Sequence, residues 1–459
     1  MQQITRRTFL KAASAGALGL ALDLRRLGPA QAAGAGVLPA TSPPRAVDYG
    51  DWRDVYREKW TWDAVVRSSH WVNCWYQAHC CWNVYVKDGM VWREEQAADY
   101  PQVRPEVPDF NPRGCQKGAC YSERMYDPAR VRHTLKRVGP RGSGKFKRIS
   151  WDQALDEIAD SVIDTIVEEG TDRVIWDLGP GISIGTQTAG QARLRVLLDS
   201  TALDMNTEIG DGHRGCAETF GKIVFERSGD DYFFSDLILC WGSNPAYTQI
   251  PNFHFLTEAR YNGAKIFCIT PDYSATAVHA DAWIPVKPGG DAALALGAAR
   301  IVIEEGWMDR KFVAEQTDLP LLVRDDTNRF LRASDLSDGG DEETLYLYDK
   351  KKGIVEAGRR SLDLGEISPV LEGRFEVTLA GGQKVTVRTV LSRLRELLED
   401  YTPEKAAEKS GTPAAQIRLL AERMAHARAA CMVTTSNFSK YYHGNLIERA
   451  QALLFALTG

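Results

Sequence analysis

The sequence lacks any concentration of basic residues. Its 56 lysines and arginines are interspersed with 61 aspartates and glutamates, and the formal net charge is −5. Such a chain has no positive stripe to attract a phosphate backbone, so nucleic-acid binding is not expected. Beyond the N-terminus the sequence also lacks an apolar run long enough to cross a bilayer, so we expect no transmembrane segment in the mature chain. Internal repeats and low-complexity tracts are lacking as well.

The N-terminus has the pattern of an export signal. Arg6 and Arg7 precede a weakly apolar run over residues 12–22, and the small residues Ala30 and Ala32 follow it. This order predicts a twin-arginine signal peptide over residues 1–32 and a periplasmic location. Because that pathway carries proteins that have already folded, we expect a cofactor to be inserted before export.

The cysteines are too unevenly spread for a disulfide framework. The chain has nine, and five of them lie between residues 74 and 120. Such crowding predicts a local metal site rather than disulfides. Thiolates and imidazole at this spacing suit an iron–sulfur cluster or zinc, and the residue types alone do not separate the two. The candidate ligands are His70, Cys74, Cys80 and Cys115.

From Ser150 onward, helical patterns alternate with short apolar runs. Runs at Leu237–Trp241 and Lys265–Thr270 flank a helical stretch over residues 251–261, and residues 291–305 have the pattern of another helix. Strands that alternate with helices predict doubly wound parallel sheets, so the expected fold class is α/β. Residues 326–389 are acidic and weakly alternating, which predicts a β-hairpin insertion. Helical character then returns, followed by a strand over residues 430–435.

Polar turns follow these expected strands. At the carboxyl ends of parallel strands such turns bind phosphate and nucleotides, although ordinary turn chemistry explains each of them equally well. The candidate residues in these turns are Gly242, Ser243, Asn244, Asp272, Gly289 and Asp291.

Two segments resemble the first domain of the type II dimethyl sulfoxide reductase family, namely residues 80–89 and 111–118. The resemblance implies a small iron–sulfur domain in which His70, Cys74, Cys80 and Cys115 hold a [4Fe–4S] cluster. Five residues separate Cys74 from Cys80, more than in the commoner family pattern, which leaves Cys81 as an alternative to Cys80. Lys117 stands where the family places a basic residue between cluster and pterin. An ordinary surface lysine is the alternative.

The turns within residues 241–245, 269–277 and 280–294 resemble the molybdopterin guanine dinucleotide half-site of the same family. The resemblance implies a bis(molybdopterin guanine dinucleotide) molybdenum cofactor. It places Ser243 and Asn244 near the pyrophosphate or pterin and Asp272 and Asp291 near the guanosine, and it makes Gly242 and Gly289 cofactor-binding as well.

The same resemblance points to Asp211 as the protein ligand to molybdenum. Cys216 is the competitor, because periplasmic nitrate reductases use a cysteine in a nearby Arg-x-Cys context. Lys440 follows the strand near residue 430, where it can stabilise a developing negative charge or guide a proton. A polar loop held by aromatic packing is the alternative interpretation of the segment around Lys440.

Within this family, residues 60–63, 75–77 and 93–101 look most like the catalytic subunits of ethylbenzene dehydrogenase and steroid C25 dehydrogenase. That likeness implies water-dependent hydroxylation of a hydrocarbon. The alternatives are a respiratory reductase for selenate, chlorate or nitrate, a dimethyl sulfide dehydrogenase, or an inactive fragment without the second pterin half-site. The implied partners are an iron–sulfur β subunit, a haem b γ subunit and a cytoplasmic assembly chaperone.

The expected organisation has five parts. Because family catalytic subunits are considerably longer, we expect this chain to be the N-terminal portion of one, with its last part incomplete. The parts are the signal peptide over residues 1–32, an arm and iron–sulfur domain over 33–149, a pterin dinucleotide domain over 150–325, a β insertion over 326–389 and a second α/β segment over 390–459.

Overall fold

The computed structural model divides the chain into two compact units. One comprises residues 1–105 and 109–209, and the other residues 106–108 and 210–459. The boundary at residue 210 falls inside the stretch 150–325 that the sequence predicts as one domain. The structure describes residues 62–69, 80–97, 99, 102, 104–108, 114–177, 185–203, 212–222, 229–358, 364–434 and 438–459, so the expected signal peptide lies outside it.

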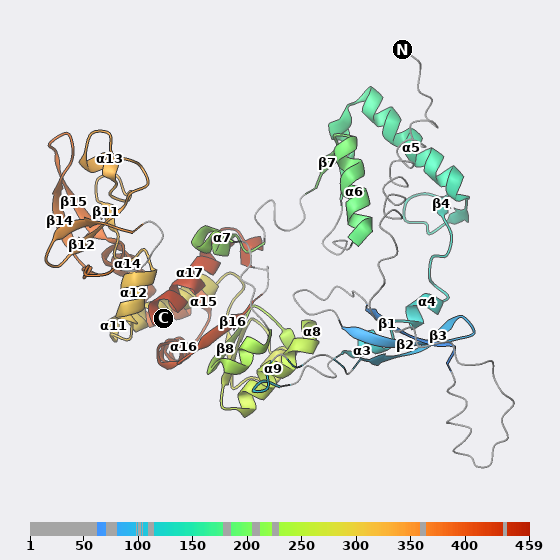
Figure 1. Ribbon diagram of the computed structural model, residues 1–459, viewed down its shortest axis with the longest axis horizontal. Coiled ribbons are helices and arrows are strands. Elements are labelled where there is room, and N and C mark those ends of the chain that lie inside the picture. The colour runs from blue at the N-terminus through green and yellow to red at the C-terminus, as the bar shows by residue number, and fades with distance from the viewer. Residues whose placement is uncertain are drawn as a thin grey trace. The chain divides into compact units, whose positions relative to one another are not determined.

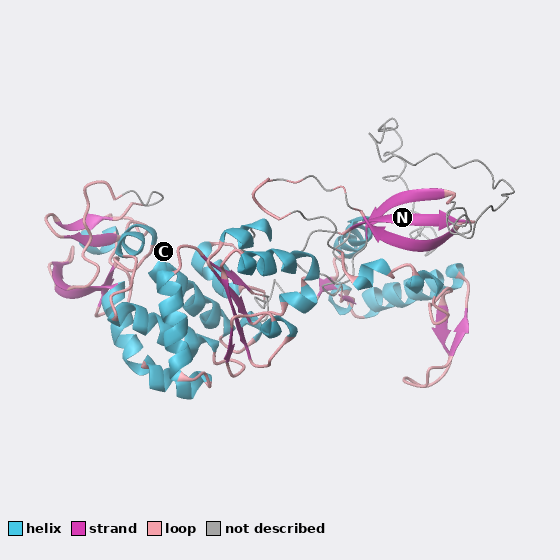
Figure 2. Ribbon diagram, turned by 90° about the horizontal axis from the view of Figure 1, so that it is seen from below, coloured by secondary structure: helices cyan, strands magenta, loops and turns pink. Residues whose placement is uncertain are grey.

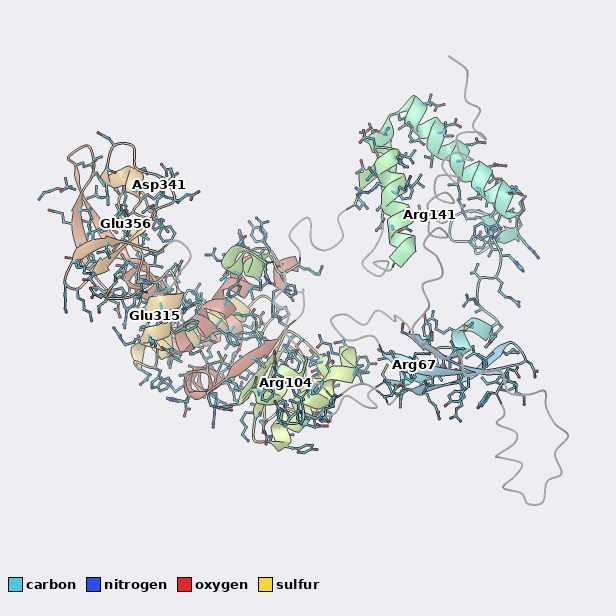
Figure 3. The ribbon with its side chains drawn as sticks, in the orientation of Figure 1. Arg67, Arg104, Arg141, Glu315, Asp341 and Glu356 are labelled. Atoms are coloured by element: carbon cyan, nitrogen blue, oxygen red, sulfur yellow. The ribbon has the colours of Figure 1, made fainter. Side chains whose placement is uncertain are left out.

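The first unit begins with an antiparallel sheet in the order β1-β2-β3 (Figure 2). A tight turn joins β2 to β3 at Asp88 and Gly89, both of which have positive φ. On β1, Arg67 forms an ion pair of 2.6 Å with Asp99 (Figure 3). A short helix, α3, packs on β3. These elements are β1 (Ala64–Ser69), β2 (Cys81–Lys87), β3 (Met90–Gln96) and α3 (Gln116–Ala119).

The rest of this unit is a hairpin followed by helices and a short parallel pair, β6 with β7. Ser150 caps α5 by accepting a hydrogen bond from Gln153 N at 3.1 Å, as its position before a helical pattern predicts. The elements are α4 (Glu123–Tyr126), β4 (Leu135–Arg137), β5 (Phe146–Arg148), α5 (Trp151–Glu168), η1 (Thr171–Arg173), β6 (Ile175–Trp176), α6 (Gly185–Leu197) and β7 (Thr201–Ala202).

The second unit is organised around a parallel sheet in the order β10-β9-β8-β16, of which Figure 1 labels β8 and β16. Every residue of β8 is buried, which explains why its sequence is one continuous apolar run. The parallel α/β sheet expected from the sequence is confirmed. Its strands are β8 (Leu237–Trp241), β9 (Lys265–Thr270), β10 (Ala282–Pro285) and β16 (Ala430–Val433).

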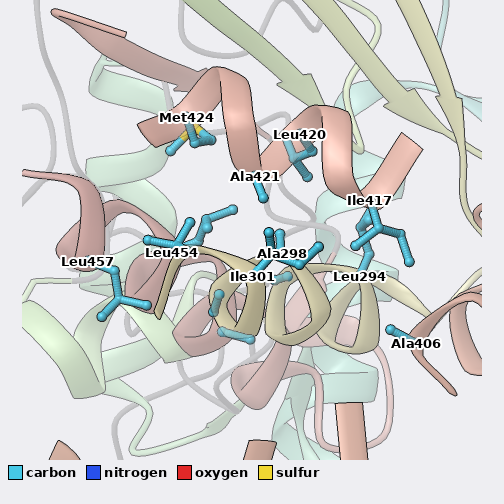
Figure 4. Packing of buried hydrophobic residues seen from close by; sticks show 14 of the residues in the cluster. Leu294, Ala298, Ile301, Ala406, Ile417, Leu420, Ala421, Met424, Leu454 and Leu457 are labelled. Carbon is cyan, nitrogen blue, oxygen red and sulfur yellow. The ribbon is translucent and has the colours of Figure 1, made fainter. Parts of the chain in front are cut away.

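Helix α11 lies at the centre of the core of this unit. Its small and aliphatic side chains, among them Leu294 and Ala298, contact residues of α16 and α17 (Figure 4). The helical elements of the unit are α7 (Arg214–Phe220), η3 (Gly229–Phe234), α8 (Pro245–Thr248), α9 (Ile250–Tyr261), α10 (Ala275–Val278), α11 (Asp291–Glu304), α12 (Arg310–Gln316), α13 (Ala333–Leu336), α14 (Val390–Leu398), η4 (Glu399–Tyr401), α15 (Pro403–Ser410), α16 (Ala414–His426), η5 (Phe438–Lys440) and α17 (Gly444–Thr458).

Between α12 and α14 the chain forms two small antiparallel sheets, one in the order β11-β15-β14 and one pairing β12 with β13. They enclose a cluster of their own that includes Leu322, Leu331 and Val387. Asp349, at the end of β12, is buried and accepts hydrogen bonds from three backbone N–H groups. The strands are β11 (Leu322–Arg324), β12 (Tyr346–Asp349), β13 (Gly353–Glu356), β14 (Arg374–Thr378) and β15 (Lys384–Thr389).

We expect Leu294→Ala to lower the free energy of unfolding by about 2–5 kcal/mol, because Leu294 is fully buried and its removal leaves a cavity between α11 and α16. Leu397→Ala is the matched control, since Leu397 is 54% exposed and its loss should change stability by about 0.5 kcal/mol or less. Chemical denaturation measures both changes. Equal effects of the two variants would contradict the assigned core.

Within the described part of the chain, no helix combines the length and the apolar character that a membrane span requires.

Candidate functional site

The carboxyl ends of the parallel strands form one edge of the sheet in the second unit. Because β8, β9 and β16 run in the same direction, the loops that follow them all leave from this edge. The sheet continues from β8 to β9 on one side and to β16 on the other, so the position between β8 and β16 is a topological switch point. Ligands of open α/β sheets bind at such points.

Ser243 and Asn244 connect the loop after β8 to its neighbours. The buried Ser243 hydroxyl donates to the carbonyl of Val433 at the end of β16, at 2.6 Å. Asn244 Oδ1 accepts hydrogen bonds from Thr276 N at 3.1 Å and from Thr276 Oγ1 at 2.7 Å. These two side chains therefore fix the shape of the edge. Thr276 has no signal in the sequence that identifies it as the partner of Asn244.

Gly242 and Asp272 occupy the turns themselves. Gly242 has a φ of +63° and its N–H donates to Ile269 O at 2.9 Å, a conformation that glycine adopts without strain. Asp272 is exposed directly after β9, and its backbone carbonyl accepts from Thr270 Oγ1 at 2.8 Å. The edge thus presents an exposed carboxylate beside a turn that permits close backbone approach.

Gly289 and Asp291 lie at the start of α11 and differ in exposure. Gly289 has a φ of +82°, and a Cβ added there would meet nothing within 4 Å. Asp291 is buried, and its Oδ1 accepts a hydrogen bond from Trp241 Nε1 at 2.9 Å. Burial raises the pKa of Asp291, against the lowering effect of the Trp241 bond.

The residues that follow Asp211 lie beside the turn that carries Lys440. Asp211 itself is outside the described residues, and Gly212 is the first described residue after it. Arg214 N donates to Ser439 Oγ at 2.9 Å, and Lys440 is exposed at the end of the same turn, η5. The structure therefore brings together two segments that the sequence separates by more than 200 residues.

Cys216 lies on α7 in an environment that disfavours a thiolate. Burial, reinforced by the neighbouring Glu448, raises the pKa of Cys216 to about 11. Because a coordinated metal deprotonates a thiol outright, this pKa describes the metal-free protein, and Asp211 stays the predicted molybdenum ligand.

Two candidate cluster ligands, Cys80 and Cys115, are described, and both are buried in the first unit. Successive residues of a strand face opposite sides, so Cys80 shares a face with Trp82, and Cys81 faces the other way. Gly114 packs on that face, where an added Cβ would lie 2.6 Å from the Trp82 ring and 1.8 Å from Gln96 Oε1. The residue before Cys115 thus contacts the face to which Cys80 belongs.

The other two candidate ligands, His70 and Cys74, lie outside the described residues. Ser69, the residue before His70, pairs with Cys81 across the sheet. Lys117 is exposed on α3, two residues beyond Cys115. Its assignment as a residue between cluster and pterin stays a prediction.

Comparison with known proteins identifies the family of the chain. Residues 99–459 match the molybdopterin oxidoreductase family. The chain belongs to this family. It is 40% identical to the dimethylsulfide dehydrogenase α subunit of Rhodovulum sulfidophilum over 100% of its length and 50% of that protein. It is 37% identical to the perchlorate reductase α subunit of Dechloromonas aromatica over 100% of the chain and 51% of the relative.

A third relative of this molybdopterin oxidoreductase is the respiratory nitrate reductase α subunit of Haloferax mediterranei, 40% identical over 99% of the chain and 48% of the relative. The chain spans about half the length of these curated relatives. Among solved structures, acetylene hydratase from Pelobacter acetylenicus shares the fold, with a TM-score of 0.57 and 23% identity over 85% of the chain and 43% of that structure.

The described residues fit the cofactors that this family implies. In the first unit, both polar atoms of the Gln96 side chain are buried without a hydrogen-bond partner among the described residues, on the face shared by Cys80 and Trp82. In the second unit, an exposed carboxylate and glycine turns follow the strands at the carboxyl edge of the molybdopterin oxidoreductase sheet. A molybdenum pterin at that edge suits this environment, whereas a [4Fe–4S] cluster near Gln96 stays a prediction.

Asp291→Asn separates a structural role of Asp291 from cofactor binding. An asparagine oxygen still accepts from Trp241, and the variant carries no buried charge. Because the pKa of Asp291 is higher in the folded than in the unfolded chain, its ionisation reduces stability as the pH rises through its titration range. We therefore expect Asp291→Asn to be at least as stable as the wild type in thermal unfolding at neutral pH. Any gain in stability over the wild type should disappear at acid pH.

The same variant should lose bound guanine dinucleotide if Asp291 recognises the guanosine. Nucleotide released from denatured protein, measured per chain by chromatography, checks this expectation. Full nucleotide content in Asp291→Asn would leave Asp291 with the Trp241 hydrogen bond as its role.

Proposed function

We propose that this chain forms part of the catalytic subunit of a molybdenum oxidoreductase that transfers an oxygen atom to or from a small substrate, either by reducing an oxyanion or by oxidising dimethyl sulfide. The observation that carries the proposal is 37% to 40% identity, across essentially the whole chain, to relatives named for dimethyl sulfide, perchlorate and nitrate. These names favour oxyanion reduction or dimethyl sulfide oxidation over the hydrocarbon hydroxylation predicted from the sequence, so we propose one of these two reactions in its place.

A bound molybdenum pterin supplies the two-electron redox chemistry, and the protein supplies binding, orientation and electrostatics. In this proposal Asp211 binds the molybdenum, Asp272 binds the guanosine, and the backbone at Gly242 approaches the pyrophosphate. Lys440 lies in the turn bonded to Arg214 and places a positive charge beside the segment that follows Asp211. Such a charge orients an anionic substrate and stabilises negative charge that develops on it.

Electron transfer completes the proposed activity. Cys80 and Cys115, together with His70 and Cys74, hold one [4Fe–4S] cluster that exchanges electrons with an iron–sulfur β subunit. A haem b γ subunit and an assembly chaperone are the further proposed partners. Arg6 and Arg7 belong to the proposed twin-arginine signal that directs the folded subunit to the periplasm.

A substrate panel tests the proposed function directly. The subunit that carries this chain is assayed with perchlorate, chlorate, selenate and nitrate against a reduced viologen dye, and with dimethyl sulfide, ethylbenzene and a sterol against an artificial acceptor. We expect turnover of an oxyanion or of dimethyl sulfide and none of the hydrocarbons. Preferred turnover of a hydrocarbon would overturn the proposal, and protein without molybdenum or iron would identify an inactive fragment.

A further inference from the structure

Glu448 lies on α17 and contacts the helix that follows Asp211 in the sequence. Its buried carboxylate accepts hydrogen bonds through Oε2 from Gly215 N at 2.7 Å and from Cys216 N at 3.3 Å. Its other oxygen, Oε1, lies 3.4 Å from His213 Nδ1. One carboxylate thus contacts two residues in the first turn of α7 and His213 immediately before it, across 233 positions of sequence.

The packing of α7 on α17 leaves little freedom for this segment. A Cβ added to Gly215 would lie 2.3 Å from Asn445 O and 2.5 Å from Glu448 Cβ, so only glycine permits the observed approach. His213, immediately before α7, is buried with a φ of +55°, a left-handed conformation that is uncommon for a residue with a side chain. The surrounding contacts must therefore hold His213 in place.

Two further hydrogen bonds attach α7 to its neighbours, one to α17 and one to η5. Asn445 Nδ2 donates to Glu218 Oε2 at 2.9 Å, near the middle of α7. Arg214 N donates to Ser439 Oγ at 2.9 Å, in the turn that contains Lys440. The segment after Asp211 is therefore attached to α17 and η5 at several points, and among these groups Glu448 is the buried charged one.

We propose that Glu448 is a positioning residue for the molybdenum site: by binding the backbone of α7 it fixes the segment directly after Asp211 relative to the turn that carries Lys440. This inference rests on the proposed function, in which Asp211 binds molybdenum. Glu448 acts through the polypeptide chain and is not assigned any contact with the metal or the substrate. Groups that orient a metal ligand in this way tune the metal and its reactivity.

A metal ion held by His213, Cys216 and Glu448 is the competing arrangement, since one potential ligand atom from each lies within 4.8 Å of the others. The observed contacts favour the positioning role, because Glu448 Oε2 already accepts from two backbone N–H groups. Metal analysis distinguishes the two arrangements.

The test compares Glu448→Ala and Glu448→Gln in the molybdenum-loaded enzyme. Alanine removes the acceptor, and we expect kcat to fall about 10- to 100-fold, the usual cost of losing a group that orients a metal ligand, with KM unchanged. The electron paramagnetic resonance signal of Mo(V) should shift, and the molybdenum and iron contents should not change. Glutamine keeps an oxygen that accepts from Gly215 and Cys216, so we expect kcat and the Mo(V) signal to be largely restored.

Asp349→Asn is the matched control. Asp349 is likewise buried and accepts backbone N–H groups, but it lies in the β12–β13 sheet, away from α7. This variant should lower thermal stability without changing the Mo(V) signal. If Glu448→Ala does not fold, Gly215→Ala takes its place, since it pushes α7 away from α17 while leaving Glu448 intact.

Three results would overturn the proposal, and they are distinguishable. A Mo(V) signal and kcat unchanged in Glu448→Ala, or an unchanged signal in Gly215→Ala, would overturn the positioning role alone. Stoichiometric zinc in the wild-type protein that is lost in Glu448→Ala would replace it with the metal site. Wild-type protein without molybdenum would remove the proposed function, and the positioning role with it.

Discussion

Replacing Cys80 with alanine is expected to reduce the iron content from about four atoms per chain to near zero and to abolish turnover with the substrate, because a [4Fe–4S] cluster requires all of its ligands. Cys80 is buried immediately before β2, and Gly114, directly before Cys115, packs against the Trp82 ring on that strand. Cys115→Ala should have the same effect. Iron and sulfide analysis, together with the signal of the reduced cluster, measures the outcome.

Cys81→Ala is the matched control for this experiment. Cys81 is the neighbouring cysteine but faces the opposite side of β2, so the variant should keep its full iron content. Loss of the cluster in Cys81→Ala with retention in Cys80→Ala would show that the ligand is Cys81. Loss of zinc instead of iron from Cys80→Ala would identify the site as a zinc site.

Asp211→Ala is expected to lower kcat by at least about 100-fold while leaving most of the molybdenum bound. The carboxylate is the proposed protein ligand that completes the metal site, whereas the pterin dinucleotide is proposed to bind elsewhere, at the turns after β8 and β9. Molybdenum content, kcat and the Mo(V) signal of the same preparation measure this expectation. The signal of the proposed iron–sulfur cluster should be unaffected, because the proposed ligands belong to the other unit.

Cys216→Ala provides the comparison for Asp211→Ala. Cys216 is the alternative ligand, so with molybdenum bound by Asp211 its loss should leave the Mo(V) signal essentially as in the wild type. If instead Cys216→Ala abolishes the signal and Asp211→Ala does not, the thiolate is the ligand and the aspartate assignment is wrong.

The sequence predicts the parallel sheet well, because its strands are buried on both faces. Leu237–Trp241 and Lys265–Thr270 are continuous apolar runs, and the structure places strands at these residues. The sequence does not predict β10, which has only four residues and one fully buried side chain, Ile284. Neither does it predict the order of the strands, since the pairing of β8 with β16 joins segments that no local pattern connects.

The sequence predicts which residues belong to the site but not which residues they contact. The sequence identifies Gly242, Asp272 and Lys440 because each follows an expected strand, and the structure places all three in loops that leave the carboxyl edge. It cannot show that Asp291 is bonded to Trp241, or that Glu448 contacts α7, because burial and long-range packing create these arrangements. Glu448 has no sequence signal beyond being an acidic residue in a helix that also carries Asn445, Arg449 and Gln451.

The place of β16 in the sheet has a consequence for how the enzyme is assembled. Ser243 and Val433, which are hydrogen-bonded at the switch point, are 190 residues apart. The β16 side of this edge is therefore synthesised long after the β8 side. Closing so large a loop is slow relative to forming local contacts. This edge of the sheet is therefore complete only late in folding, which is when the proposed pterin dinucleotide and the proposed assembly chaperone would need access to it.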